Sequence, residues 1–364
     1  MTTDFDAAIV VAGPAGAAAA IALTRLGRRV LLVDAASNPY RKIGESLPGA
    51  ARPLLLDLGV LPQFLAGDHR PCYGNVAFWG SERPTVHDFL FDPHGHGWHL
   101  DRACFDRMLL DGAREAGAEV RLGAPFRSVN SAEDGTRVVS FEGTNGTYSC
   151  RWMLDATGRR SLVSRQFGAL RRRHDQLVAI HASFRVQNDG DDRTWIEACP
   201  DGWWYSADIP GSRRVAAFFT DVNIGAKTLR NRSAFLDKLH STQHLRSPFA
   251  RSEMDSEPHW TDAATTILEQ AVGEGWCAVG DAAIAFDPLC SQGLFSALYT
   301  GLRAAQAVDT ALDGSTSALE SYAERLKEIA TQYHRNLAYC YAQERRWNDS
   351  PFWRCRHQLD LQHR

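Results

Sequence analysis

The sequence predicts an α/β protein, α+β when the whole chain is considered, with a Rossmann-like parallel sheet, an antiparallel sheet and C-terminal helices. Three observations predict this class. A strand–helix–strand pattern with a glycine turn spans residues 6–34, and short aromatic and β-branched runs separated by turn signals lie between residues 177 and 222. Apolar residues then recur at steps of three and four within 316–347. The 364 residues fit two or three domains.

The first unit is predicted as a strand over 6–11, a helix over 15–26 and a strand over 28–34. The first strand is apolar without alternation, which is typical of buried parallel strands. The helix is rich in Ala and Leu, and Gly27 is placed to end it. Asp34 follows the glycine turn by about 20 positions, where a carboxylate that accepts from a ribose hydroxyl is expected.

The glycine turn itself is incomplete. Residues 10–20 read VVAGPAGAAAA, so Val11 stands where the first glycine of G-x-G-x-x-G is expected, whereas Gly13 and Gly16 are present. Gly13 lets the backbone approach a pyrophosphate, and Gly16 lets helix and strand pack closely. A β-branched residue at this turn predicts local strain on the order of 1 kcal/mol or more. We therefore expect a real but weakened nucleotide site, tightened by Val11→Gly.

Two later segments extend the nucleotide pattern. In MLDATGRRS, 153–161, an apolar strand ends at Asp155 before a turn at Gly158. In WCAVGDAAIAFDPLCSQGLFSALYTGLRAAQAV, 276–308, a strand leads to Gly280 and Asp281, and Pro288 precedes a long helix. A carboxylate after such a strand can accept from a ribityl or ribose hydroxyl. The helix N-terminus offers N–H groups to an anionic ring.

The rest of the chain predicts an antiparallel sheet and helices. LVAIHASFRV, DGWWYSADIP and RRVAAFFTDV are short strand-like runs. The helical face over 316–347 is formed by five apolar residues: Leu319, Tyr322, Leu326, Ile329 and Tyr333. The end of the chain, NDSPFWRCRHQLDLQHR, is mixed, and Pro351 is predicted to break the helix.

Composition excludes several classes of function. The net charge of −3 predicts no nucleic-acid partner, and RRR at 171–173 is predicted to be a solvated patch. The eight cysteines form no CxxC pattern, and HGHGWH at 94–99 lacks supporting carboxylates, so we expect reduced thiols and no metal. The acidic start MTTDFD argues against a signal peptide, and no stretch reaches the ~20 apolar residues of a membrane span. We expect a soluble, cytoplasmic protein.

Taken in order, these segments resemble the FAD-dependent monooxygenases of the para-hydroxybenzoate-hydroxylase fold. RKIGESLPG, 41–49, is similar to the branch that contains the flavin halogenases, and HLDRACFDRMLL, 99–110, supplies an Arg102 and Asp106 pattern. The resemblance implies an FAD-binding domain over 1–76, 98–170 and 265–325. It also implies an inserted substrate domain over 77–97 and 171–264, and a C-terminal helical segment over 326–364.

The resemblance implies FAD as the cofactor, reduced by NAD(P)H or by a flavin reductase. The implied FAD-binding residues are Gly13, Pro14, Ala15, Gly16, Asp34, Arg41, Ser46, Arg102, Asp155, Gly280, Asp281, Gly293 and Leu294.

The halogenase reaction requires a lysine that receives hypohalous acid. The segment where the resemblance places it, HRPCYGNVAFWGSE at 69–82, contains none, with Tyr73 at the roughly matching position. The W-x-W-x-I-P signature is altered to WWYSADIP. Together with YGNVAFWGS, AFDPLCSQGL and ERRWNDSPFW, this is similar to the flavoproteins that mature tryptophylquinone cofactors. That resemblance implies hydroxylation, through a flavin C4a-hydroperoxide, of a tryptophan side chain in a precursor protein or peptide.

Candidate catalytic residues are His181 or Asp208 for proton handling and Pro288 beside the flavin ring. Trp79 and Trp204 are candidates for stacking on a substrate indole. Structural roles are the alternatives: a hydrogen-bonded histidine, an edge carboxylate and core tryptophans. Two other functions stay open. One is a hydroxylase or halogenase of a free small aromatic, and the other is a non-catalytic maturation or binding protein with weak FAD affinity.

Overall fold

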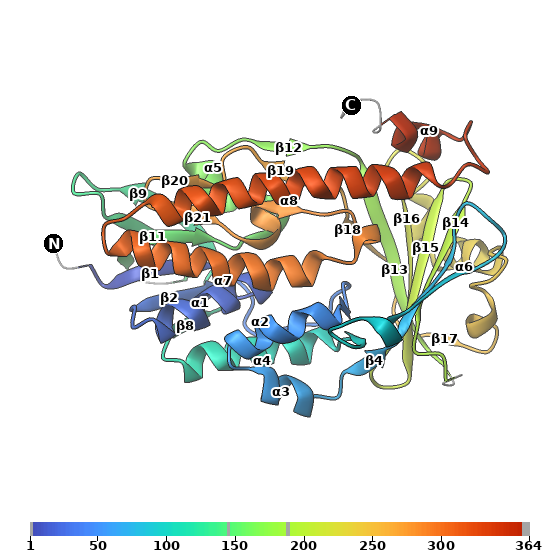
Figure 1. Ribbon diagram of the computed structural model, residues 1–364, viewed down its shortest axis with the longest axis horizontal. Helices are drawn as coiled ribbons and strands as arrows, with labels where there is room; N and C mark the ends of the chain where they lie inside the picture. The colour runs from blue at the N-terminus through green and yellow to red at the C-terminus, as the bar shows by residue number, and fades with distance from the viewer. Residues whose placement is uncertain (1–2, 144–145, 187–189, 359–364) are drawn as a thin grey trace.

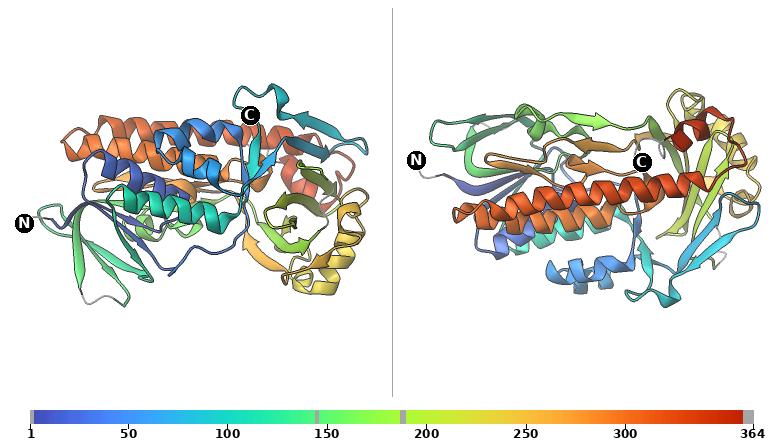
Figure 2. Two further views of the ribbon diagram at one scale, coloured as in Figure 1. Left: turned by 90° about the horizontal axis from the view of Figure 1, so that it is seen from below. Right: turned by 45° about the horizontal axis from the view of Figure 1, so that its top comes forward.

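The computed structural model describes residues 3–143, 146–186 and 190–358; the parts of the predicted domains at 1–2, 144–145, 187–189 and 359–364 lie outside the described residues. A layered α/β part and an antiparallel sheet lie side by side along the long axis of the molecule (Figure 1). The long helix α8, Ser317–Ala342, reaches from the first part to the second, where α9, Pro351–Gln358, follows it (Figures 1 and 2).

The first sheet is mainly parallel, with the order β20-β21-β11-β1-β2-β8, and β10 and β9 extend it antiparallel from β11. The central strands β1 and β2 are apolar and buried along nearly their whole length, as predicted for a sheet covered on both faces. Its strands are β1 (Phe5–Val10), β2 (Val30–Asp34), β8 (Glu119–Leu122), β9 (Phe126–Ser131), β10 (Arg137–Phe141), β11 (Thr147–Asp155), β20 (Val272–Gly273) and β21 (Trp276–Ala278).

Parallel pairing brings the predicted nucleotide segments to one edge. β1 pairs in parallel with β11 and β2, and β11 pairs in parallel with β21. The carboxyl ends of these strands therefore lie together, and ligands of such sheets bind at that edge. Val11, Asp34, Asp155 and Gly280 all lie at or directly after these strand ends.

Small residues allow the covering helices to approach closely. α1 begins at Pro14 and carries a run of fully buried alanines, Ala17 to Ala20. A Cβ atom added at Gly301 of α7 would overlap the carbonyl oxygen of Ala15, so α1 and α7 pack nearly backbone to backbone. The helices of this part are α1 (Pro14–Arg25), α2 (Arg52–Asp57), α3 (Leu61–Ala66), α4 (Arg102–Glu115), α5 (Leu162–Gln166) and α7 (Gly293–Leu312).

The second large sheet has the order β17-β13-β16-β15-β14-β5-β6, with β18 also paired to β13. β5 begins at Gly74, slightly before the predicted domain boundary at 77, and pairs in parallel with β14. The strands are β5 (Gly74–Phe78), β6 (Thr85–Asp88), β13 (Leu177–Arg185), β14 (Thr194–Cys199), β15 (Gly202–Ile209), β16 (Arg213–Asp221), β17 (Glu253–Met254) and β18 (His259–Asp262).

Side chains of this second sheet alternate between two cores. Trp203 and Phe219 stack with ring centroids 4.0 Å apart on the face that joins the first core. Trp204 and Phe218 point to the other face, where α6 (Arg232–His240) covers them with Phe235.

Two small sheets connect the parts, in the orders β3-β7-β4 and β12-β19-β22. Their strands are β3 (Ser46–Leu47), β4 (Arg70–Cys72), β7 (Gly97–His99), β12 (Arg171–Arg173), β19 (Thr266–Leu268) and β22 (Ile284–Ala285).

One local prediction about the C-terminal helices was wrong. Pro351 does not break a helix but starts α9, because a proline at the first helical position lacks only an N–H that has no helical partner. Among the helices of the described ranges, none has both the length and the apolarity needed to cross a bilayer.

Candidate active site

The glycine turn contains a strained valine. Val11 has φ +83°, in the left-handed region that a β-branched residue rarely adopts, so the predicted strain is confirmed. Its N–H donates to Val33 O at 2.7 Å, and the next N–H, of Ala12, donates to Asp34 Oδ2 at 2.8 Å. The second oxygen of Asp34 accepts from Ala36 N at 2.8 Å. Asp34 thus holds the turn against β2 while remaining half-exposed at the site.

Gly13 and Gly16 play different parts. A Cβ at Gly16 would overlap the carbonyl oxygen of Val11, so this position needs glycine. A Cβ at Gly13 would meet only Val11 Cγ1, at 4.0 Å, so the space beside Gly13 is open. Gly13 is also the N-cap of α1 and provides no side-chain cap, and Pro14 and Ala15 follow in the first turn. The first N–H groups of α1 are therefore available to an anion.

A second helix N-terminus shares these properties. The short helix η7, Pro288–Cys290, precedes α7, and Ser291 turns the chain with φ +51°. α7 has no side-chain cap, and a Cβ at Gly293 would meet nothing within 4 Å, whereas Leu294 is buried and anchors the helix.

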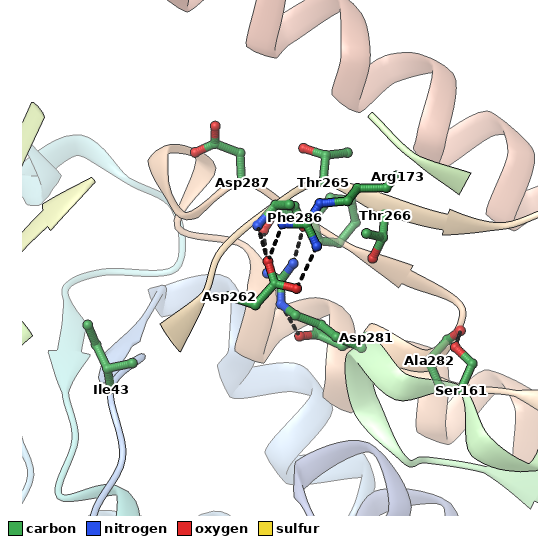
Figure 3. A network of polar contacts seen from close by, with 12 residues as sticks. Ile43, Ser161, Arg173, Asp262, Thr265, Thr266, Asp281, Ala282, Phe286 and Asp287 are labelled. Atoms are coloured by element: carbon green, nitrogen blue, oxygen red, sulfur yellow. Dashed lines mark hydrogen bonds and ion pairs between the residues drawn. The ribbon is translucent and has the colours of Figure 1, made fainter. Parts of the chain in front are cut away.

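Asp281 presents a carboxylate beside these termini. Its side chain is 39% exposed and lies 3.6 Å from the Arg159 guanidinium. Figure 3 shows Asp281 at this contact, with Ile43 on a separate loop. The neighbouring Gly280 has φ +56°, and its N–H donates to Thr300 Oγ1 at 2.8 Å.

Arg171 holds the Asp281 loop in place. Its guanidinium donates to the carbonyl oxygens of Asp281 at 2.6 Å and Ala282 at 2.8 Å, and to the hydroxyls of Ser161 and Thr266. The prediction of a solvated RRR patch is therefore wrong for Arg171, because the loop folds over it. Arg172 and Arg173 are exposed.

Asp155 lies at the same edge but is fully buried. Its Oδ1 accepts from the N–H and hydroxyl of Thr157, and its Oδ2 accepts from the N–H and hydroxyl of Ser164. The carboxylate thus braces the turn into α5, and the structure does not bring it to the exposed surface beside Gly13 and Asp281.

A cavity of about 200 Å³ lies between the α/β part and the antiparallel sheet. The loop that carries RKIGESLPG forms one wall, and β13, β15 and β16 form the other. Three predicted residues line it, namely Arg41, Arg102 and His181. Ser46 lies on β3, one residue beyond the lining residue Glu45.

Arg102 organises the loop wall. Its Nη1 donates to Gly44 O at 2.8 Å and Ile43 O at 3.2 Å, and its Nη2 lies 3.3 Å from Asp106. Lys42, the lysine that lines the cavity, has its ammonium 2.5 Å from the same buried Asp106.

His181 is neutral in this cavity. Its Nε2 lies 3.2 Å from Thr261 Oγ1, and its ring centroid is 5.9 Å from that of His259. Burial, reinforced by His259, lowers the pKa of His181 to about 4. A neutral imidazole on the substrate-domain wall can accept a proton at neutral pH.

The structure does not bring three predicted residues to this cavity. Asp208 is buried in an ion pair, 2.5 Å from Arg214 Nε and 3.3 Å from Arg70. Trp204 is fully buried in the second core, on the far face of its sheet.

Trp79, the third, packs against the C-terminal helices. Its indole N–H donates to Cys340 O at 2.8 Å, and its ring contacts Trp203 and Trp353. Among the described residues, no group of three or more His, Cys, Asp or Glu side chains is arranged to hold a metal ion.

The residues at the sheet edge fit FAD. Two helix N-termini without side-chain caps suit a pyrophosphate and an anionic flavin ring, and the open space beside Gly13 lets a phosphate approach. Asp281 offers an exposed acceptor for a hydroxyl.

The comparisons with known proteins agree with this assignment. A family model described as an FAD binding domain matches residues 4–337. A protein of Marinomonas mediterranea named "Putative FAD-dependent oxidoreductase LodB" is 30% identical over 368 residues, and the alignment covers 99% of each chain.

Solved structures show the same fold. The myxobacterial chondrochloren halogenase CndH matches with a TM-score of 0.89 and 24% identity, over 97% of this chain and 85% of that one. The peptidyl tryptophan dihydroxylase QhpG, essential for tryptophylquinone cofactor biogenesis, matches with a TM-score of 0.73 and 23% identity, over 97% and 78%. The predicted fold class and the FAD cofactor are thereby confirmed. The chain belongs to the family that carries this FAD binding domain, and it is an FAD-dependent oxidoreductase of the monooxygenase type.

Proposed function

We propose that this enzyme hydroxylates an electron-rich aromatic ring, and that the ring is a tryptophan side chain in a precursor protein or peptide. Similarity to LodB along the whole chain supports a shared type of reaction. The fold is also that of QhpG, which acts on a peptidyl tryptophan. Indole is electron-rich, so it needs an electrophilic oxygen and a group that manages protons.

The observation that carries this proposal is the state of the lysine at the cavity. Halogenation in related flavoproteins needs a lysine that receives hypohalous acid, and residues 69–82 contain none. Lys42 lines the cavity, but its ammonium is 2.5 Å from Asp106, whose side chain is only 4% exposed. The ammonium of Lys42, whose side chain is 33% exposed, is thus held by a buried carboxylate, and a lysine committed to an ion pair is poorly placed to react. The cavity therefore favours oxygen transfer to carbon over halogenation.

The residues of this chain have separate tasks in such a reaction. FAD, when bound, supplies the two electrons and the site of oxygen activation, and flavin enzymes of this family are reduced by NAD(P)H or by a flavin reductase. The N-termini of α1 and α7, with Asp281, hold the cofactor. The antiparallel sheet closes the cavity, and His181 accepts the proton that the ring loses.

The test is oxygen incorporation. The purified protein, with FAD, a flavin reductase and NADH, is incubated with a tryptophan-containing peptide under isotopically heavy O₂, without halide. We expect a mass gain of one or two heavy oxygen atoms on the tryptophan, and none in a matched peptide with Trp→Ala. Intact FAD binding with no labelled product on any indole would overturn the proposal.

One observation favours a second function, the halogenation or hydroxylation of a free small aromatic. Lys42 is a lysine at the cavity, and the CndH halogenase has the same fold. The same incubation with free tryptophan or a pyrrole, with and without bromide, distinguishes the two. Bromide-dependent product that disappears in Lys42→Met would establish the second function.

A further inference from the structure

The cavity contains a buried carboxyl group that the sequence analysis did not select. Glu45 lies in RKIGESLPG, lines the cavity and is only 3% exposed. Its Oε2 accepts from Gly44 N at 2.9 Å, whereas its Oε1 has no hydrogen-bond partner among the described residues. The backbone carbonyl of Glu45 accepts from Leu100 N at 2.8 Å, which fixes the residue against β7 and the start of α4.

Among the described residues, no cation that lines the cavity forms an ion pair with this carboxyl group. The charge of Arg102 acts on Glu45, but its guanidinium is committed to Asp106 and to two carbonyl oxygens. Lys42 is likewise paired with Asp106, and Arg213 faces Asp101 at 3.9 Å. The other titratable or charged groups that line the cavity are Arg41, His181, Asp255 and His259.

Tyr205 approaches Glu45 from the antiparallel sheet. Its hydroxyl is buried and interacts with the Glu45 carboxyl, but neither this hydroxyl nor Glu45 Oε1 has a hydrogen bond of ordinary geometry. Burial raises the pKa of Glu45, although Tyr205, backbone N–H groups and Arg102 act to lower it. Burial of this carboxyl group without an ion-pair partner therefore favours its neutral, proton-donating form.

Glu45 and His181 thus face one cavity from opposite walls. Glu45 belongs to the loop of the α/β part, and His181 belongs to β13 of the antiparallel sheet. Burial favours the neutral form of both groups: a carboxyl group that can donate a proton and an imidazole that can accept one. The two side chains therefore suit an acid and a base acting in one cavity.

We propose that Glu45 is the proton donor of the reaction. Glu45 supplies the proton that oxygen reduction consumes, and His181 accepts the proton that the aromatic ring loses. This inference rests on the proposed hydroxylation. Its sum is FADH⁻ + O₂ + Ar–H + H⁺ → FAD + Ar–OH + H₂O, in which reduced FAD supplies both electrons and one proton. One oxygen atom forms the new C–O bond, the O–O bond breaks, and the other oxygen leaves as water.

The protons balance through the two side chains. Glu45 supplies the H⁺ on the left of the sum and is reprotonated from solvent. The ring C–H bond breaks, and its proton passes to His181, which returns it to the departing oxygen. Each turnover therefore takes up one proton from solvent.

The test compares Glu45→Gln with the control Glu320→Gln, an exposed glutamate on α8. Three quantities are measured: the FAD dissociation constant, the infrared C=O band of a neutral carboxyl group at pH 7, and the yields of hydroxylated peptide and H₂O₂. We expect Glu45→Gln to lose the infrared band and to lower the hydroxylation rate about 10²-fold, the range of general acid catalysis. Oxygen should then be released as H₂O₂, with the FAD dissociation constant unchanged. The control should behave as the wild type.

Two results would overturn the assignment of Glu45. One is an unchanged hydroxylation rate in Glu45→Gln, and the other is FAD binding weakened as strongly as catalysis, which would make Glu45 a cofactor ligand. The infrared band needs no substrate. If the wild-type protein hydroxylates no aromatic ring, the proposed function fails. The infrared C=O band that Glu45→Gln should lose then still tests this inference. If the wild type lacks this band, Glu45 is not a neutral proton donor.

Discussion

Replacing Val11 by glycine tests the strain at the nucleotide turn. Val11 has φ +83°, and a residue held in such a region carries about 1–3 kcal/mol of strain. Glycine removes that strain but costs about 0.5–1 kcal/mol through its greater freedom in the unfolded chain. Losing the half-buried valine side chain costs roughly another 0.5 kcal/mol, a fraction of the value for full burial. We therefore expect Val11→Gly to raise the free energy of unfolding by about 1 kcal/mol.

The assay is urea denaturation of the FAD-free protein, with Val11→Ala as the control. Alanine also loses the branched side chain, but it keeps a left-handed penalty of about 1–2 kcal/mol. A glycine variant less stable than the alanine variant would refute the strain argument.

FAD titration measures the second consequence of Val11→Gly. Val11 Cγ1 lies 4.0 Å from the Cβ position of Gly13, beside the space that a phosphate approaches. Removing that side chain should lower the FAD dissociation constant, and an equal or higher constant would contradict this part of the reasoning.

Three further predictions concern the same site. Gly16→Ala should lose measurable FAD binding in an absorbance titration, because its Cβ would overlap the Val11 carbonyl oxygen. Arg171→Lys should destabilise the protein to urea by about 3 kcal/mol and weaken FAD binding, because lysine cannot reproduce the planar set of donors. The wild type should lose unfolding free energy as the pH falls because of His181, and His181→Gln should not show this part of the loss. The pKa of His181 is about 4 when folded and 6.5 when unfolded, so the unfolded state binds more protons in between, and unfolding at pH 7 and 4.5 should differ less in the variant.

The fold could be predicted largely because its signals are local. The strand–helix–strand unit around Gly13 and Gly16 is specified by apolar runs, small residues and turn residues close together in the sequence. The strand that contains His181 was likewise visible from its β-branched and aromatic residues. Parallel pairing then brought segments far apart in sequence, such as Asp34 and Asp281, to one sheet edge.

The cavity could be predicted only in part, because side-chain direction depends on tertiary packing. A one-residue step along a strand reverses the face, and this separates Trp204 in the second core from Tyr205 beside Glu45. Asp208 reads as an available carboxylate until the fold places Arg214 beside it. Glu45 was overlooked because a glutamate in a loop motif usually lies in solvent. The neighbouring residues in RKIGESLPG, several of them apolar or glycine, were the feature of the sequence that could have indicated its burial.

The buried Asp287 offers a final prediction, on the chain segment that leads to Pro288. Its Oδ1 accepts from Leu289 N at 2.9 Å, and its Oδ2 accepts from the Tyr341 hydroxyl at 2.7 Å. Burial, helped by Asp175, raises the pKa of Asp287 to about 6, against 3.8 ordinarily. Between these values the folded state binds more protons than the unfolded state. This group's contribution to stability is therefore full below pH 3.8, falls as pH rises to about 6, and is constant above.

Asp287→Asn keeps the size of the side chain and cannot ionise. Its unfolding free energy should therefore not show the fall that Asp287 causes as the pH rises. Between pH 4 and pH 7, the wild type should lose roughly 2 kcal/mol of unfolding free energy relative to the variant. Urea denaturation at several pH values measures it, with the exposed Asp237→Asn on α6 as the control. A constant difference across this range would mean that Asp287 is already ionised at pH 4. The short helix η7, which begins at Pro288, would then be held by a charged cap, with Tyr341 donating to a carboxylate throughout.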